Sequence, residues 1–439
     1  MNINLRAVDS LFLVRRPVAL SYSAIASAFI GTGILLIFVE ALFFDYFSGL
    51  ANSSFTTRRI IGFHLFPSEL WFVFLGNFML FLMLGNRGFV VPRYLFVNSR
   101  PIFLVLGVYS LWFVYGSLAG NSWALQEFRE VVFTALSLPP ILYFASYMNV
   151  GIALRRTVLP GMVLLLAMSI FNLHNSALMI GTFFASFWAL RLLFSNPLAI
   201  VGLGFASLPF LIKFSKPTIV MFAFCIMVSF LLAGHLNRNS VNWIFSKFKL
   251  KIVLVGLSIL LALLALVAVI NAWTGGAIEE IIRWYFLKER LTASGETIYA
   301  DVSGGRFAIW RAAIESWVER PILGYGLGAE VQAYSSGWVN KVQFHSYLIQ
   351  GLHNTGLLGL ATIVGGWSIW LLRTLRRVAL VSDVHDKILL AAMLAYVFGI
   401  FFFGLYGHSL SYPPSAQLFW LCVGALCAVR APRQYRVSA

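Results

Sequence analysis

The 439-residue chain has very few charged side chains. Only 11% of its residues are Asp, Glu, Lys or Arg, whereas 60% are hydrophobic. An ordinary soluble domain carries roughly a quarter charged residues, so this sequence cannot cover a water-facing surface. The lack of charge excludes an ordinary soluble protein and predicts an all-α polytopic membrane protein.

Cysteine is scarce as well. Cys225, Cys422 and Cys427 each lie inside an apolar segment, and they provide neither a disulfide framework nor the ligand spacing of a zinc site. The predicted outer loops also lack Asp-x-Asp and His-x-x-x-His patterns. We therefore expect no metal and no other cofactor.

Acidic residues are outnumbered by basic ones, 16 against 32, which gives a net charge of +16. The basic residues do not form one block. They occur in short groups between apolar runs, which is the pattern that orients a membrane protein. This distribution argues against nucleic acid as a partner and favours membrane lipids.

Apolar segments long enough to span a bilayer recur along the chain. The first follows Arg15-Arg16 and is too long for the core of a signal peptide, so we expect it to be retained. The sequence shows no long repeat, and we predict a single membrane domain, 1–439. About twelve spanning helices are predicted, at 18–43, 68–84, 102–118, 131–147, a fifth ending near Phe171, 176–190, 197–212, 217–233, 252–272, 354–372, 388–406 and 415–429.

The positions of Lys and Arg predict the orientation of these helices. With the N-terminus inside, the inside segments hold far more basic residues than the short outside loops. Both termini are therefore predicted to be cytoplasmic. The longest polar interval, 273–353, becomes one large extracytoplasmic loop between the ninth and tenth helices. Within it we expect helices at 279–290 and 306–320 and a glycine-rich turn at 324–328.

Several basic residues lie on the predicted outer side, against the orientation signal. They are Lys216, Arg129, Arg306 and Arg311. Gathered together, guanidinium and ammonium groups would bind an anion, and the natural anion at this depth is the diphosphate of a lipid carrier. Simpler roles are also open. Arg129 can pair with the glutamates beside it, Lys216 can snorkel to the interface, and Arg311 and Arg320 can pair with glutamates of their own segment.

His345 is the most informative titratable residue of the predicted loop, because it precedes an apolar run at the expected outer interface. A neutral imidazole there can accept a proton from a sugar hydroxyl. A structural, hydrogen-bonded histidine is the alternative. His353 follows eight residues later, about two helical turns, and can share a face with His345.

Together these stretches form a motif that points to a family. It comprises Ser303-Gly304-Gly305-Arg306 with Trp310-Arg311, then Glu319-Arg320-Pro321-Ile322-Leu323-Gly324-Tyr325-Gly326-Leu327-Gly328, and His345-Ser346-Tyr347-Leu348 with Gln350, Gly356 and Gly359. This segment, about 303–360, resembles the shared core of the O-antigen ligase and O-antigen polymerase superfamily.

The resemblance implies a GT-C-like, inverting, metal-independent glycosyltransferase. Such an enzyme moves a glycan from an undecaprenyl-diphosphate carrier to a glycan or lipid acceptor at the periplasmic face of the bacterial inner membrane. By resemblance, Arg306 binds diphosphate and His345 is the base towards the acceptor hydroxyl. A second basic position of the family falls on Lys216, where Arg is usual, and Ser346 stands where the family often has Asn.

The acceptor is left open by the resemblance. A polymerase extends a carrier-linked repeat unit of O-antigen or exopolysaccharide and can work with a chain-length regulator. We favour it slightly, because both substrates then carry diphosphate. A ligase transfers the glycan to lipid A-core. From another class, a lipid-linked glycan flippase predicts charged residues within several helices and internal repeats. A non-catalytic scaffold would not need Arg and His gathered on one loop.

Overall fold

A computed structural model defines most of the predicted membrane helices. It describes residues 16–43, 65–85, 92–147, 160, 161, 163, 165, 175–194, 196–212, 216–236, 289–291, 297–299, 306–335, 338–341, 344–407, 410 and 412–429. The predicted helix 252–272 and most of the predicted fifth helix lie outside these residues. The total of twelve helices therefore stays a prediction.

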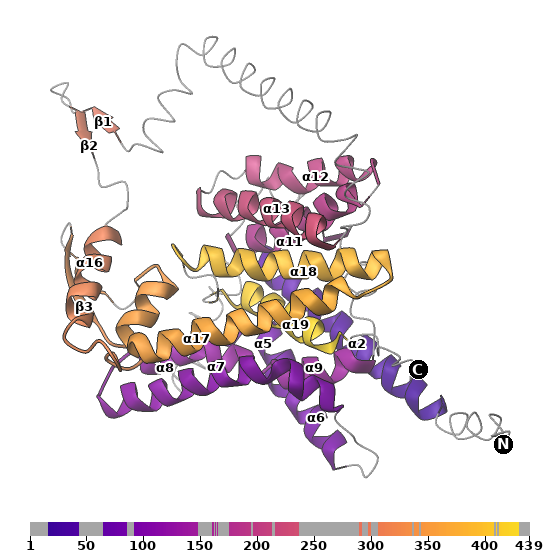
Figure 1. Ribbon diagram of the computed structural model, residues 1–439, viewed down its shortest axis with the longest axis horizontal. Coiled ribbons are helices and arrows are strands. Elements are labelled where there is room, and N and C mark those ends of the chain that lie inside the picture. The colour runs from indigo at the N-terminus through magenta and orange to yellow at the C-terminus, as the bar shows by residue number, and fades with distance from the viewer. Residues whose placement is uncertain are drawn as a thin grey trace, which may run out of the picture. The chain divides into compact units, whose positions relative to one another are not determined.

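The described part of the chain is mostly helical, with two short hairpins (Figure 1). Seven of its helical segments are long and apolar enough to cross a membrane, and three shorter apolar helices accompany them. The elements are α2 (Arg16–Leu42), α5 (Pro67–Glu69), the π-helix η1 (Leu70–Leu75), α6 (Gly76–Leu84), α7 (Arg93–Leu118), α8 (Ala124–Phe128), the π-helix η2 (Arg129–Phe133), α9 (Leu138–Tyr147), α11 (Asn175–Leu193), α12 (Ala199–Ile212), α13 (Lys216–Leu236), β1 (Glu289–Leu291), β2 (Thr297–Tyr299), α16 (Arg306–Trp317), β3 (Val331–Ser335), β4 (Trp338–Lys341), α17 (Tyr347–Ala379), α18 (Val384–Phe403) and α19 (Pro413–Ala428).

The membrane class predicted from composition is confirmed, with differences at helix ends. Helix α17 begins at Tyr347 rather than at residue 354, because the polar residues Gln350, His353 and Asn354 interrupt its apolar pattern over the first two turns. The predicted helix 279–290 is wrong at its end, where β1 pairs with β2 in antiparallel register. The predicted helix 306–320 is present as α16 and ends before Pro321, since proline cannot continue a helix.

The chain divides into two compact units. The membrane-helix unit consists of Met1–Leu236, Glu319–Ala329 and His345–Ala439, and the second unit of Asn237–Val318 and Glu330–Phe344. The predicted loop 273–353 is therefore shared between them. Its glycine-rich turn and its histidine belong with the membrane helices.

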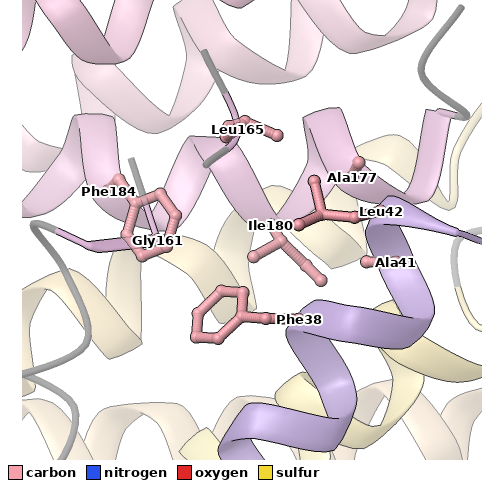
Figure 2. Close-up of a pocket in the computed structure, with 8 residues that line it drawn as sticks. All are labelled: Phe38, Ala41, Leu42, Gly161, Leu165, Ala177, Ile180 and Phe184. Carbon is pink, nitrogen blue, oxygen red and sulfur yellow. The ribbon is translucent and has the colours of Figure 1, made fainter. Parts of the chain in front are cut away.

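The core of the membrane-helix unit surrounds α18 and α19. Helix α18 packs against α11, α13 and α19, and α19 packs against α9 and α2. Nearly every side chain of α19 is buried, and Cys225, Cys422 and Cys427 are buried free thiols, as expected of apolar fillers. Packing between α2 and α11 is close enough that the cavity beside Phe38 and Phe184 is only about 10 Å³ (Figure 2), too small for a ligand.

Helix α17 is broken at Gly356, where φ is 62° and ψ is −171°. Only glycine adopts this backbone conformation readily. The residue also faces the loop that precedes the helix so closely that a Cβ would overlap the carbonyl group of Ile322. The 319–329 loop therefore occupies the gap that the break opens in α17, alongside α7 (Figure 1).

The loop replaces the hydrogen bonds that the helix loses on one side of the break. In a regular helix the carbonyl groups of His353 and Asn354 would accept from residues four positions later. Here they accept from the N–H groups of Tyr325 and Gly326, at 3.1 and 2.8 Å. Both carbonyl groups are thereby satisfied without water.

The other side of the break is completed in the same way. The N–H groups of Leu357 and Leu358, which no longer reach the preceding turn, donate to the carbonyl groups of Pro321 and Ile322 at 2.9 and 3.2 Å. Irregular backbone at membrane depth is tolerated only where protein buries it and satisfies its polar groups. Loop 319–329 meets that requirement for α17.

The described part of the second unit is built on α16. This helix packs against β3, which pairs with β4. The indole N–H of Trp310 donates to the carbonyl of Phe344 at 2.6 Å, so the helix is fixed to the segment that follows the hairpin. The rest of its surface includes exposed residues such as Arg311 and Ile314.

We expect Gly356→Ala to destabilise the protein by about 3 kcal/mol or more, because it adds backbone strain and overlap with the loop. The matched control is Gly365→Ala on the same helix, where a Cβ meets no atom within 4 Å and alanine favours the helix. Thermal unfolding of the purified protein in detergent measures both. Equal melting temperatures for the two variants would contradict the role given to the break.

Candidate functional site

Glu127, on α8, is the polar centre of the membrane-helix unit. Its Oε2 accepts the N–H of Gly328 at 2.8 Å and the side-chain amide of Asn354 at 2.7 Å. Its Oε1 accepts the side-chain amide of Gln350. The residue is only 7% exposed. Three donors around one buried carboxylate offset much of its desolvation cost, and they tie α8 to both the loop and α17.

A second set of contacts holds the loop from the side of α7. The amide of Asn121 donates to the carbonyl groups of Tyr325 and Leu327 at 3.0 and 2.9 Å. The indole N–H of Trp112 donates to the carbonyl of Leu323 at 2.7 Å. The loop is thus hydrogen-bonded to α7 on one side and to α17 on the other.

The glycines of the loop explain its predicted turn. Gly324, Gly326 and Gly328 all have positive φ, which favours glycine. At Gly328 a Cβ would also overlap the backbone of Ala124. This close approach brings the N–H of Gly328 within reach of Glu127.

An aromatic stack lies beside this network. The ring of Tyr325 is parallel to that of His353, with centroids 4.9 Å apart, and the guanidinium of Arg320 lies 4.7 Å from the centroid of the Tyr325 ring. The Tyr325 hydroxyl donates to Glu319 at 2.7 Å. Arg320 thus contacts an aromatic ring rather than forming the predicted salt bridge.

His345 lies immediately before α17, partly buried, with φ of 54°. A non-glycine residue in this region is uncommon and often marks a functional site. Ser346 follows as the N-cap, and its hydroxyl accepts the N–H of Ile349 at 3.4 Å. Since Ser and Asn are both good N-caps, Ser346 provides the same helix start as an asparagine would. Because His345 precedes the helix, the expected shared helical face with His353 does not apply.

A cavity of about 320 Å³ lies between α7, η2, α17, α18 and α19. Its walls are mostly apolar, with Ile363, Trp367, Phe401 and Trp420 among the lining residues. The volume is in the range of ligand sites in proteins. An alkyl or isoprenoid chain is the ligand chemistry that such walls accept.

A smaller polar cavity, of about 20 Å³, borders the apolar one. Tyr109, Val131, Tyr347 and Gly351 line both cavities. The remaining lining residues of the small cavity include the network around the buried glutamate, namely Glu127, Glu130, Gln350 and Asn354. The side-chain Oε1 of Gln350 is buried without a hydrogen bond, so it can accept one from a ligand hydroxyl.

The charge of the small cavity limits what it can bind. Its described lining residues include two glutamates and no Lys or Arg. The neighbouring phenol of Tyr412 responds to the same environment, because burial and then the carboxylate of Glu130 raise its pKa above the usual range. Carboxylates and amides can hydrogen-bond a neutral hydroxyl, whereas a carboxylate repels a diphosphate.

The predicted cationic residues have different surroundings. Arg129 forms an ion pair with both oxygens of Glu69 at 3.1 Å and is 12% exposed. An internal ion pair was the simpler expectation, but its partner is on α5 rather than beside Arg129 in the sequence. Arg129 lines neither of these two cavities. Lys216 begins α13, and its side chain lies outside the described residues.

The other two predicted cations belong to the second unit. Arg306 begins α16 and is partly exposed. Arg311 pairs with Glu315 at 2.8 Å on the helix surface, with side chains 81% and 64% exposed, as expected from their spacing. Hydrogen bonding and charge from Glu315 raise the pKa of Arg311. A joint site of Arg306, Lys216 and His345 stays a prediction.

Sequence reasoning missed Glu127 as a site residue. Its partners lie more than 200 positions later in the chain, and no periodicity reports such contacts. The available signal was a carboxylate near the start of an apolar span, beside Arg129 and Glu130, and an ionisable residue in such a span is a functional candidate by default.

Comparison with known proteins adds no relative: no protein-family model and no curated protein sequence matches the chain.

We expect Glu127→Ala to lower the free energy of unfolding by about 3 kcal/mol or more, because it leaves several buried donors without an acceptor. Glu127→Gln should be milder, since one acceptor oxygen remains. Thermal or denaturant unfolding in detergent tests whether Glu127→Ala is less stable than Glu127→Gln.

The control for this prediction is Glu315→Ala. It removes a carboxylate of an exposed pair on α16, and exposed pairs contribute little. If Glu127→Ala unfolds at the same temperature as this control, the carboxylate is not a structural centre.

Proposed function

We propose that the protein is an inverting membrane glycosyltransferase that moves a glycan from an undecaprenyl-diphosphate carrier to an acceptor at the periplasmic face of the bacterial inner membrane. A polymerase of O-antigen or exopolysaccharide units is the favoured form, and an O-antigen ligase acting on lipid A-core is the alternative. The observation that carries the proposal is a pair of adjoining cavities, one apolar and one polar and lined by carboxylates. Tyr347, two residues after His345, lines both.

The paired cavities suit an apolar chain next to a hydroxyl group. The large cavity can hold a segment of an isoprenoid chain, whereas the small one has room for a single hydroxyl or water and presents Glu127, Asn354 and the unsatisfied Oε1 of Gln350. Tyr347 lines both, so a ligand occupying them passes the start of α17. The His345 imidazole is attached at that same point of the backbone.

The proposed reaction is a single displacement. The acceptor hydroxyl loses its proton to His345 as its oxygen forms a bond to the anomeric carbon, and the bond from that carbon to the diphosphate breaks. Arg306 and Lys216 neutralise the departing diphosphate. Arg129 and Arg311 are secondary in this scheme, because glutamates already hold their guanidinium groups.

The proposed topology completes this picture. It has about twelve spans, cytoplasmic termini and a periplasmic loop at 273–353. With that orientation the start of α17, and therefore His345, faces the periplasm. The transfer would then occur where an already flipped carrier presents its glycan.

A flippase for lipid-linked glycans is a second candidate, and one observation favours it. Helix α17 is discontinuous, as helices of transporters often are. The buried glutamates Glu40, Glu69 and Glu127 lie close to the ends of their apolar spans, so they do not mark a charged path through the helices. Deletion of the gene separates the classes. If the mutant makes chains of a single repeat, the protein is a polymerase; if it accumulates carrier-linked polymer that never reaches lipid A-core, the protein is a ligase. Carrier-linked units that accumulate in the cytoplasm indicate a flippase.

We expect His345→Ala to reduce glycan transfer by about 10²- to 10⁴-fold, the usual contribution of a general base, without loss of folded protein. In the same assay Arg306→Lys should retain partial activity, because lysine keeps the charge but loses the bidentate contact. Transfer from a purified lipid-linked donor is measured alongside the melting temperature.

His385→Ala and Arg376→Lys are the matched controls, since both residues are exposed on other parts of the helices. Each should transfer at the wild-type rate. Full activity of His345→Ala would rule out the base, and full activity of Arg306→Lys would argue against a bidentate phosphate contact.

We expect Gly351→Leu to raise the KM for a long-chain donor by about tenfold, because the new side chain extends into both cavities. A donor with a short isoprenoid chain should be affected less. Gly365→Leu is the control, because Gly365 lies on the same helix but lines neither cavity. An equal effect on long and short donors would place the carrier chain elsewhere.

A further inference from the structure

Three ionisable side chains from distant parts of the chain meet near the ends of α2, α5 and η2. They are Glu40, Glu69 and Arg129. Glu40 and Glu69 are completely buried, and none of the three lines the apolar or the polar cavity. Ionisable residues buried among membrane helices are costly and are usually retained for a function.

Glu69 has a full set of partners. Both of its oxygens contact the guanidinium of Arg129 at 3.1 Å, and its Oε2 also accepts the N–H of Phe66 at 3.0 Å. The charge of Glu69 is therefore matched by one arginine. That ion pair leaves the second glutamate to be accounted for.

Glu40 is only half satisfied. Its Oε2 accepts the backbone N–H of Ser68 at 2.9 Å, but its Oε1 has no hydrogen-bond partner. The hydroxyl of Ser68, on the residue that already contacts this carboxylate, is also buried and lies beside it. A carboxyl oxygen and a hydroxyl thus lie together in the core.

The surrounding charges do not balance this carboxylate. Among the described residues, Glu69 and Arg129 are the charged groups that act on Glu40, and with both glutamates ionised the three carry a net charge of −1. Helices α9 and α19, which also pack on α2, contain no acidic or basic residue, and α11 contains only Arg191 in its last turn. An uncompensated buried carboxylate is strongly unfavourable.

We propose that Glu40 and Ser68 hold one monovalent cation, a proton or Na⁺, which neutralises the Glu40–Glu69–Arg129 group. The donors are all oxygens, which suits these cations rather than a transition metal.

A cation bound at this site would stabilise the candidate functional site, because η2 connects the two. Arg129 begins this π-helix, which also carries Glu130, and Glu127 lies just before it. The cation therefore fixes the position of the segment from which the polar cavity is built. This role is separate from the transfer reaction, because its measurement requires no donor or acceptor.

The test is thermal unfolding of the purified full-length protein in detergent. One series exchanges NaCl for KCl or choline chloride at constant ionic strength. A second, without Na⁺, runs from mildly acidic to mildly alkaline buffer. Bound Na⁺ raises the melting temperature of the wild type by several degrees in NaCl only. A bound proton makes the native state hold one more proton than the unfolded chain, so stability falls as the pH rises.

Glu40→Gln is the decisive variant, because it is a neutral isostere of the protonated group. It should remain folded and lose the wild-type response, whereas the exposed control Glu315→Gln should keep it. Ser68→Ala weakens only a Na⁺ response. If Glu40→Gln does not fold, two measurements on the wild type test the proposal instead: calorimetric titration with NaCl, which detects Na⁺ binding, and the pH series of melting temperatures. A wild type that responds to neither cation, or a Glu40→Gln response equal to that of the wild type, overturns the proposal.

Discussion

The need to satisfy backbone hydrogen bonds away from water governs the centre of this protein. A membrane helix broken at Gly356 exposes two carbonyl and two N–H groups that it cannot pair by itself. Loop 319–329 pairs all four. These hydrogen bonds fix where the loop enters the membrane-helix unit. They require the loop backbone to approach the helices so closely that only glycine fits at several of its positions. The broken helix and the glycine-rich motif are therefore one structural feature.

The carboxylate of Glu127 completes that feature and gives it a chemical character. Its three donors come from the loop and from α17, so the same residue that joins these segments also lines the polar cavity. A carboxyl group at this point offers no positive charge to a diphosphate but can hydrogen-bond a hydroxyl. If a carrier-linked glycan binds here, its diphosphate has to lie away from Glu127, towards the start of α17. In that case the residues that contact the hydroxyl differ from the basic residues that the sequence predicts to bind the diphosphate.

The membrane class and most helices could be predicted because composition and run length are local properties. The pairing of Arg311 with Glu315 is local too and was correct, whereas α16 ends at Trp317, three residues before its predicted end. The start of α17 was missed because Gln350, His353 and Asn354 interrupt its apolar pattern, and Arg129 was given the wrong partner. Glu69 lies 60 residues from Arg129, and the partners of Glu127 lie 201 to 227 residues away. Such contacts depend on helix packing, which sequence periodicity does not report.

The short segment of α8 and η2 connects two networks that otherwise share no residue. Glu127 faces the loop and α17, whereas Arg129, two positions later, reaches Glu69 on α5. A π-helix begins at Arg129 and changes the angular spacing of the side chains, as π-helical turns at functional sites often do. Because both networks are buried, moving one would leave charged or polar groups of the other without partners. Buried charge in this unit thus fixes the helices relative to one another.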